Sequence, residues 1–363
     1  MAISKIPSAG FQDNVKFRNI IINGDMSIAQ RGTSATGLGN ADNGYHTCDR
    51  WKFTEVGTAT AEFTQTQSTD VPTGQGFATS LKMDCTTAQG SLGANEIFRI
   101  QQHIEGQNLQ YLKKGTANAE SLTLSFWVKS NKTGTYTVYF YDNNNTRINS
   151  KSYTINSADT WEKKTITYAG DTTGAFDNDN NLSLLVSFQL LAGTDYTSGT
   201  LQDWGTNVSA NFAPGQVNLA DSTSNEWYIT GVQLEAGTAS DFEFLPVDVN
   251  ENRCLRYYQN FIDGSGQLLG FGNYYVANNL RAFGEFLTPM RVNASLEVSD
   301  VTDNFRFLRE GASDYVNDFY LINKTSKKVW GIVNDTDASG SAGVTGYIQS
   351  NQTDSYLAFD AEL

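Results

Sequence analysis

Five side chains of this sequence combine aromatic rings with amide groups. They are Trp127, Tyr139, Tyr141, Gln189 and Gln233. Aromatic rings stack on the apolar faces of sugar rings and amides hydrogen-bond to hydroxyl groups, so such a set could bind a glycan. Aromatic side chains are also enriched where protein subunits meet, and that use of such a face is at least as common. The residue types alone therefore leave two alternatives, a glycan-binding face and a subunit interface.

Residues that could catalyse a reaction are sparse. The two histidines, His46 and His103, have no spacing that indicates a metal site, so we interpret each as a satisfied surface or core side chain. No nucleophile elbow, phosphate-binding loop or zinc-protease motif occurs. Two carboxylates about 5–10 Å apart could cleave a glycosidic bond, and the 39 acidic residues leave that alternative open. We expect a protein that is not an enzyme.

Alternation of apolar and polar residues predicts that the three aromatic candidates lie on β-strands. Residues 121–130 place Trp127 opposite an apolar set, which is typical of a half-buried strand. That set is Leu122, Leu124, Phe126 and Val128. Residues 135–145 place Tyr139 and Tyr141 opposite a second set, which is Tyr136, Val138 and Phe140. Because the short intervening turn contains a glycine, the two runs predict a β-hairpin.

Two further strands are expected to carry the amides, in the same sheet as the hairpin. Residues 182–193 place Gln189 opposite an inward set of Leu184, Val186, Phe188 and Leu190. In residues 225–237, strict alternation puts Gln233 on the face of Trp227, Ile229 and Glu235, opposite Tyr228, Thr230, Val232 and Leu234. Short strands, many turn residues and few helical patterns together predict an all-β protein.

The charge balance excludes some partners. The chain has 363 residues, long enough for two or three domains, and a net charge of −14. Nucleic acids and anionic membranes both attract clustered Lys and Arg, so neither is expected as a partner. No apolar run approaches the length of a membrane span. The three cysteines, Cys48, Cys85 and Cys254, lack metal-ligand spacing and are expected to be buried thiols.

Four segments of the chain resemble virion proteins of tailed bacteriophages. They are NIIINGDMSIAQRG at 19–32, DRWKF at 49–53, NEWYITGVQLEAG at 225–237 and FEFLPVDVNENRCLRYYQ at 242–259. In that family an N-G-x-M or N-G-x-F opening starts a β-sandwich similar to carbohydrate-binding modules. A G-V-Q-L-E-x-G segment closes the sandwich, and a C-x-R-Y-Y segment leads into the next domain.

The resemblance implies a jelly-roll, galactose-binding-like β-sandwich in a phage virion structural protein, such as a tail fibre or a related surface appendage. It implies assembly with other virion proteins, attachment to a host surface glycan, and a location on the virion surface after synthesis in the bacterial cytoplasm. Fibre proteins usually form homotrimers, so three copies are favoured. The alternatives are a capsid decoration or head-fibre protein and a glycan depolymerase. Depolymerases of this kind are usually parallel β-helices, and this chain lacks the periodic repeat of that fold.

The predicted organisation has four parts. Residues 1–18 form a docking arm or a frayed terminus, 19–245 the sandwich, 246–260 a helical connector, and 261–363 a small C-terminal β-domain whose residues 337–363 supply two short strands. Sandwiches of the resembled family often bind a structural calcium ion near the opening turn, where Asp25 is the one matching residue. Gly231 stands where that family often has a liganding aspartate. No metal site and no cofactor are therefore assigned.

Overall fold

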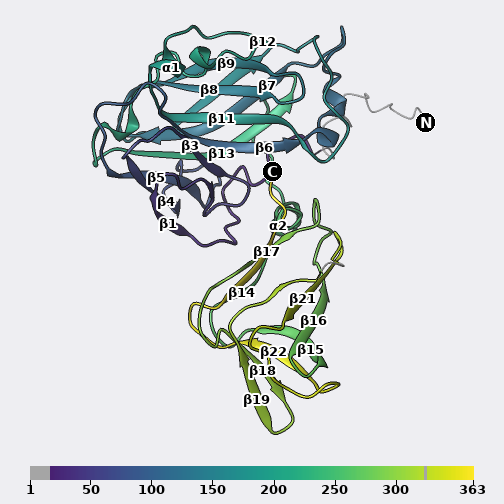
Figure 1. Cartoon of the computed structure of the whole chain (residues 1–363). Coiled ribbons are helices and arrows are strands. Elements are labelled where there is room, and N and C mark those ends of the chain that lie inside the picture. The colour runs from purple at the N-terminus through teal and green to yellow at the C-terminus, as the bar shows by residue number, and fades with distance from the viewer. Residues whose placement is uncertain (1–16, 323–324) are drawn as a thin grey trace, which may run out of the picture. The chain divides into compact units, whose positions relative to one another are not determined.

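The computed structural model describes residues 17–322 and 325–363. These residues form two compact units built almost entirely of β-strands (Figure 1). The first unit comprises 17–27, 34–44 and 52–245, and the second comprises 28–33, 45–51 and the residues from 246 onward. The all-β class predicted from the alternation is confirmed. The predicted N-terminal arm lies outside the described residues except for Phe17 and Arg18.

Two β-sheets make up the first unit, in the layered arrangement of a jelly-roll sandwich (Figure 1). Sheet A has the order β1 (Ser34–Leu38), β4 (Glu62–Ser68), β5 (Ser80–Thr87), β13 (Glu226–Ala236), β7 (Leu122–Ser130), β10 (Glu162–Tyr168). Sheet B has the order β12 (Gly205–Thr206), β9 (Arg147–Ile155), β8 (Gly134–Asp142), β11 (Leu182–Ala192), β6 (Ile97–Glu105), β3 (Lys52–Val56), β2 (Gly44–Tyr45). The connections contain short helices, which are α1 (Thr194–Thr197), η2 (Gly106–Asn108), η3 (Gln110–Leu112), η4 (Ser209–Asn211) and η5 (Leu219–Asp221).

Aromatic side chains from both sheets meet in the core of the sandwich. Phe126 of β7 contacts Tyr153 of β9 and Phe188 of β11, with ring centroids 5.0 and 5.1 Å apart. Phe188 also contacts Trp227 of β13, at 6.3 Å. Each such buried ring stabilises the fold by about 1.5–3 kcal/mol. These contacts confirm the inward faces predicted for residues 121–130 and 182–193.

The hairpin predicted over residues 121–145 is wrong, although both of its strands exist. β7 pairs with β13 and β10 in sheet A, whereas β8 pairs with β11 and β9 in sheet B. The turn between them therefore carries the chain from one layer to the other. Alternation identifies the buried face of a strand but not its partner. Two strands that face each other across a core give the same pattern as two strands that lie side by side.

A β-bulge in β13 corrects the strict alternation predicted for residues 225–237. The register with β7 shifts between Thr230 and Gln233, so the positions that face the core are odd-numbered before the bulge and even-numbered after it. The inward set is Trp227, Ile229, Val232 and Leu234. Gly231 adopts a left-handed φ of +61°, and a Cβ there would lie 2.5 Å from the ring of Phe77. Only glycine suits this position.

The opening and closing segments of the resemblance lie side by side in the sandwich. The Ile20 N–H donates to the Leu234 carbonyl and the Val232 N–H donates to the Gly24 carbonyl, both at 2.9 Å. The Asn19 side-chain amide donates to the Val232 carbonyl at 3.0 Å. A Cβ on Gly24 would lie 2.1 Å from that same carbonyl oxygen, so this close approach requires glycine. The opening segment itself forms no regular strand.

The second unit contains one helix and two sheets. The predicted helix is present as α2 (Val247–Leu255). Sheet C has the order β14 (Tyr258–Asp263), β23 (Tyr356–Asp360), β17 (Ser295–Val298). Sheet D has the order β19 (Ala312–Val316), β18 (Phe305–Arg309), β22 (Thr345–Ser350), β15 (Leu268–Val276), β16 (Asn279–Glu285), β21 (Val329–Asn334), β20 (Tyr320–Leu321). The two strands predicted for residues 337–363 are β22 and β23.

Two short segments from the start of the chain complete the second unit. Arg31 donates to Asp360 at 2.8 Å and lies over the ring of Tyr258, 3.4 Å from its centroid. Arg50 forms an ion pair with Glu362 and is almost fully buried. These interactions connect residues 28–33 and 45–51 to the last residues of the chain. Neither the composition nor the alternation of the sequence indicates that these two early segments belong to the second unit.

The remaining predictions concern thiols and membranes. All three cysteines are buried, and burial raises the pKa of the Cys85 thiol to about 11. A thiol with a raised pKa is a poor nucleophile. None of the helices in the described part of the chain is long and apolar enough to cross a membrane.

Candidate functional site

The outer face of sheet B presents polar side chains in rows across neighbouring strands. Thr54 of β3 is opposite Arg99 of β6, and Arg99 is opposite Gln189 of β11. We call these three residues the polar row. A second row is Lys52, Gln101, Ser187, Tyr139 and Ser150, from β3, β6, β11, β8 and β9. Neighbouring strands lie about 4.8 Å apart, so the polar row spans about 10 Å, the scale of a short oligosaccharide.

Each member of the polar row has a buried polar atom that lacks a hydrogen-bond partner within the described chain. These atoms are Thr54 Oγ1, Arg99 Nε and Gln189 Oε1. A buried polar atom without a partner costs about 1–3 kcal/mol, so folded proteins leave few of them. Three in one row, drawn from three adjacent strands, leave hydrogen-bonding capacity that an ordered water or a polar ligand group could satisfy. The row offers a hydroxyl, a cationic donor and an amide acceptor.

Tyrosine side chains hold the arginine of the polar row in place. The Arg99 guanidinium donates to the Tyr139 hydroxyl at 2.9 Å. Tyr196, in the segment that follows β11, lies close to the same guanidinium. Burial raises the pKa of Tyr196, and the charge of Arg99 opposes that rise. Tyr196 is half-buried. Its ring is therefore a half-buried aromatic surface close to Arg99.

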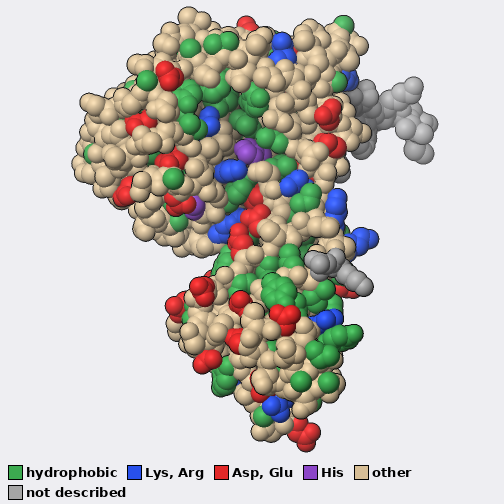
Figure 2. Space-filling model, viewed as in Figure 1, with side chains coloured by type: hydrophobic (Ala, Val, Ile, Leu, Met, Phe, Trp, Pro, Cys, Tyr) green, Lys and Arg blue, Asp and Glu red, His purple; other side chains and the backbone are tan. Residues whose placement is uncertain are grey.

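Residues 194–218, which we call the roof, fold back over part of this face. Phe212 stacks on Tyr139 with ring centroids 4.7 Å apart, and Tyr196 stacks on Phe212 at 5.9 Å. Strand β12, within the roof, extends sheet B by pairing with β9. As a result Tyr139 is only 3% exposed. Figure 2 shows hydrophobic side chains gathered over β8 and β11, with basic and histidine side chains beside them near β6.

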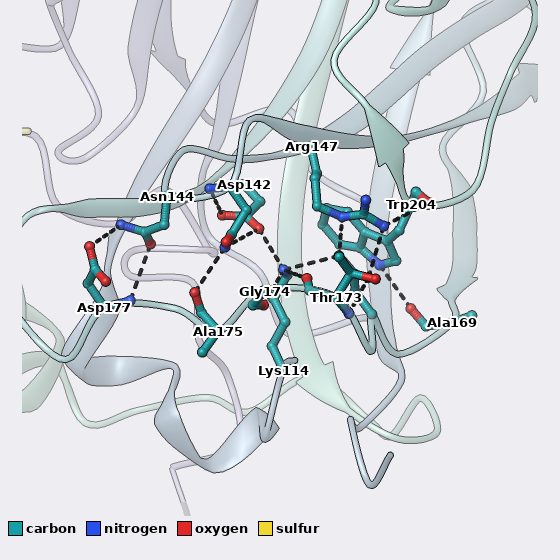
Figure 3. Close-up of polar contacts among 12 residues, drawn as sticks. Lys114, Asp142, Asn144, Arg147, Ala169, Thr173, Gly174, Ala175, Asp177 and Trp204 are labelled. Atoms are coloured by element: carbon teal, nitrogen blue, oxygen red, sulfur yellow. Dashed lines mark hydrogen bonds and ion pairs between the residues drawn. The ribbon is translucent and has the colours of Figure 1, made fainter. Parts of the chain in front are cut away.

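A buried lysine anchors a second long polar connection, residues 171–181, at one edge of the sandwich (Figure 3). The Lys114 ammonium lies 2.6 Å from an Asp142 carboxylate oxygen and 3.0 Å from one of Asp171. It also donates to the backbone carbonyls of Thr173 and Gly174, each at 2.8 Å. All three ionic side chains are at most 4% exposed. The ammonium thus pairs with both carboxylates, and Asp142 would otherwise be buried without a cation.

The same network reaches the roof. Arg147 donates to both carboxylate oxygens of Asp171, at 2.8 and 3.0 Å, and to the backbone carbonyl of Trp204 at 3.0 Å. The Trp204 indole N–H donates to the Ala169 carbonyl at 2.9 Å (Figure 3). Both long connections are therefore fixed to the sandwich by charged and aromatic side chains. Neither is a free loop.

Asp142 and Asp171 do not have the properties of a hydrolytic pair. A glycosidase acid needs a raised pKa. Burial alone would raise the pKa of Asp171, but hydrogen bonds from Arg147 and Lys114 outweigh burial and lower the pKa. A carboxylate held in its charged form cannot donate a proton to a leaving group. The role that this geometry supports for the pair is to hold Lys114.

The five residues proposed from the sequence fall on two sheets. Tyr139, Tyr141 and Gln189 share the outer face of sheet B. Trp127 and Gln233 lie on sheet A, so the expectation of a single sheet is wrong. Tyr139 and Gln189 are buried, and Tyr141 packs against the cluster under the roof. Gln233 is fully buried among hydrogen bonds to Glu235, Ser240 and Asp241. Trp127 is half-buried.

Sequence reasoning missed Arg99, Thr54 and Tyr196. For Arg99 a signal existed, because residues 97–105 alternate Phe98, Ile100 and Ile104 with Arg99, Gln101 and His103. For Tyr196 there was none, since residues 194–218 have no period and their contact with sheet B is long-range.

Asp25, the residue that matches a calcium position of the resembled family, lies in a turn fixed by hydrogen bonds. Among residues 17–322 and 325–363, no group of three or more His, Cys, Asp or Glu side chains is arranged to hold a metal ion. An Asp25 carboxylate oxygen accepts from Ser27, and the Asp25 carbonyl accepts from Thr79 and Thr230. The turn is thus held by hydroxyl groups from neighbouring segments.

Comparisons with known proteins find matches among solved structures, each at low sequence identity. No protein-family model and no curated protein matches the sequence. The solved structures include the enzymatically active domain of bacteriophage CBA120 tailspike protein 4, with a TM-score of 0.31, 16% identity, and coverage of 60% of this chain and 21% of that one. A family 11 carbohydrate-binding module from Clostridium thermocellum has a TM-score of 0.27 and 10% identity, and the match covers 56% of this chain and 97% of that one. A putative sugar-binding protein from Bacteroides thetaiotaomicron has a TM-score of 0.30 and 12% identity, and the match covers 60% of this chain and 100% of that one. Our fold assignment rests on the sheet topology described above.

Proposed function

We propose that the first unit binds a glycan through the polar row on the outer face of sheet B. The observation that carries the proposal is the row itself, in which three adjacent strands each bury a polar atom without a partner. Sugar hydroxyls can donate to Gln189 and accept from Arg99, and Tyr196 offers a ring beside them. The proposed action is binding without cleavage, and the Asp142–Asp171 pair supports it, because these two carboxylates hold a lysine.

We further propose that the chain is a phage virion surface protein, such as a tail fibre, displayed in three copies. The support is the pairing of the opening and closing segments that carry the resemblance, joined through Asn19, Gly24 and Val232. A weak single site gains from display in several copies, since linked sites raise the overall avidity. Labelling virions with an antibody against this chain tests the location. Label on the capsid, or none on the particle, contradicts a tail fibre.

A substitution in the polar row has an unusual expected signature. In Thr54→Val the shape is kept and the buried hydroxyl is removed. The free protein should become more stable by about 1 kcal/mol, because a buried group without a partner is lost. Its affinity for the host polysaccharide should fall about fivefold to tenfold, since one hydrogen bond is lost. Urea denaturation and calorimetric titration measure the two effects.

The matched control is Thr165→Val, an exposed threonine on the outer face of sheet A. It should leave both quantities unchanged. Arg99→Met should weaken binding about tenfold to a hundredfold, as expected for a charged donor. Unchanged binding in both polar-row variants contradicts the proposed site. Release of reducing sugar from the polysaccharide by the unaltered protein contradicts binding without cleavage.

A further inference from the structure

The outer face of sheet D carries a row of apolar side chains. The strand registers bring β18, β22, β15, β16, β21 and β20 together in that order. The apolar row, as we call it, consists of Leu308, Tyr347, Phe271, Phe283 and Ile322. Phe271 is 80% exposed and Phe283 is 60% exposed. Figure 2 shows hydrophobic side chains at the surface of this unit near β16 and β21. Rings this exposed are uncommon on a surface that meets only water.

Polar side chains flank the apolar row on both sides. On one side Arg306 donates to Gln349 at 2.8 Å. On the other side Arg281 lies over the ring of Tyr275, 3.9 Å from its centroid. Asp and Lys are absent from the registered positions that flank the row, and Glu285 is the one Glu among them, although the chain has 39 acidic residues. Protein interfaces are enriched in aromatic residues and arginine and depleted in these three charged types.

A pocket of about 360 Å³ interrupts the row at Gly331. Its walls are Phe283, Ile322, Val329 and Trp330, and among the lining residues that the structure describes the charged group is Glu285. A Cβ on Gly331 would lie 2.9 Å from the Phe283 ring, so the glycine keeps the pocket open. The Trp330 indole N–H is buried and has no hydrogen-bond partner in the described chain. Apolar walls, two of them aromatic, and one carboxylate suit an apolar side chain better than a sugar, which needs several polar partners.

We propose that the apolar row docks against a second copy of this chain, with Phe271 of one copy entering the pocket over Gly331 of the other. The same chain supplies both parts of the contact. Arg281 and Arg306 flank the projecting ring, and Glu285 lines the pocket, so the charges around the two parts are complementary. The rest of the chain is acidic and repels its own copies, which leaves an acid-poor face as the place where copies can meet. This inference deepens the proposed multicopy display and is independent of the glycan site.

Light scattering on the purified chain tests the interface. The unaltered protein should associate at micromolar concentration. Phe271→Glu and Val329→Glu should each be monomeric at that concentration, since the first destroys the projecting ring and the second destroys the pocket. Mixed together, the two variants should form a one-to-one complex, because each retains the part that the other lacks. The control is Val247→Glu, a 68% exposed position on α2, which should associate like the unaltered protein.

The outcomes separate this inference from the glycan site. Both variants alter exposed side chains, and circular dichroism should show them folded. A monomeric unaltered protein overturns the proposal, as does a mixture that fails to restore the complex. Glycan affinity per monomer should stay the same in Phe271→Glu. If that affinity falls and the unaltered protein is monomeric, the apolar row binds glycan and the interface is rejected.

Discussion

The outer faces of sheets B and D occupy equivalent positions in their units, but one is mainly polar and the other mainly apolar. Each is the outward side of a multi-stranded sheet whose inward side fills a core. Sheet B carries polar atoms that are buried without partners, under the edge of a roof. Sheet D carries aromatic rings that project into solvent beside an open pocket. A polar ligand can form the hydrogen bond that an unsatisfied polar atom lacks, whereas an apolar partner can remove an exposed ring from water.

The difference also lies in how each face is supported. On sheet B, stacked rings and the Lys114 network hold the roof and its neighbouring connection against the strands. A site held in advance loses less freedom when it binds a small ligand. The apolar row of sheet D has two short strands, β19 and β20, at the sheet edges. Its projecting rings and its pocket suit contact with a large, apolar partner surface.

The largest expected effect comes from removing the buried ammonium of Lys114 at the edge of the sandwich. Lys114→Met leaves Asp142 and Asp171 buried without their ammonium, which should lower the free energy of unfolding by about 3–5 kcal/mol. Urea denaturation followed by tryptophan fluorescence measures the change. Lys113→Met is the control, because Lys113 pairs with Glu120 at the surface and contributes about 0–1 kcal/mol. Equal effects of the two substitutions would show that the buried network does not anchor the sandwich.

A somewhat smaller effect is expected from opening the roof. Phe212→Ala removes the ring between Tyr139 and Tyr196, and the lost packing should cost about 3 kcal/mol in the free energy of unfolding. Glycan affinity should fall severalfold, because Tyr196 loses the ring that positions it. Thermal unfolding and calorimetric titration measure the two quantities. A rise in affinity would mean that the roof blocks a larger site built on Tyr139.

The cost of Lys114→Met should depend on pH. The pKa of Asp171 is held below its ordinary value of 3.8, so its contribution to stability is complete above that value. The contribution is lost as the pH falls through the lowered pKa. The gap in unfolding free energy between the unaltered protein and the variant should therefore narrow as the pH drops from about 5 to below 3. Denaturation curves across this range measure it, and a constant gap would argue against ionised carboxylates as the partners of Lys114.

The smallest effect is expected at Trp127. Trp127→Ala should leave glycan affinity unchanged within error, because Trp127 lies on sheet A, in a different layer from the polar row. Calorimetric titration of the glycan into Trp127→Ala and into Arg99→Met compares the two affinities directly. Weaker binding in Trp127→Ala would move the glycan site to the other face of the sandwich.

Alternation in the sequence predicted the buried faces of the strands but not their partners. The inward sets around Phe126 and Phe188 are correct because burial follows the period of the strand. The hairpin fails because pairing is a long-range property, and β13 departs from its period because Gly231 inserts a bulge. Tyr139 has the predicted orientation, but no local pattern shows that Phe212 covers it from 73 residues away. The outward position of Arg99 could have been predicted, since apolar and polar residues alternate clearly in its strand.

The exchange of segments at the start of the chain has a consequence for synthesis. Arg31 and Arg50 leave the ribosome early, but their partners Asp360 and Glu362 are added some 329 and 312 residues later. Domains tend to fold in order as the chain emerges. The sandwich can complete its sheets once residue 245 has been made, whereas the second unit must wait for residues 356–363. A nascent chain that stalls before that point cannot finish the unit whose face we propose for self-association. If the proposal holds, such unfinished chains should not associate with finished ones.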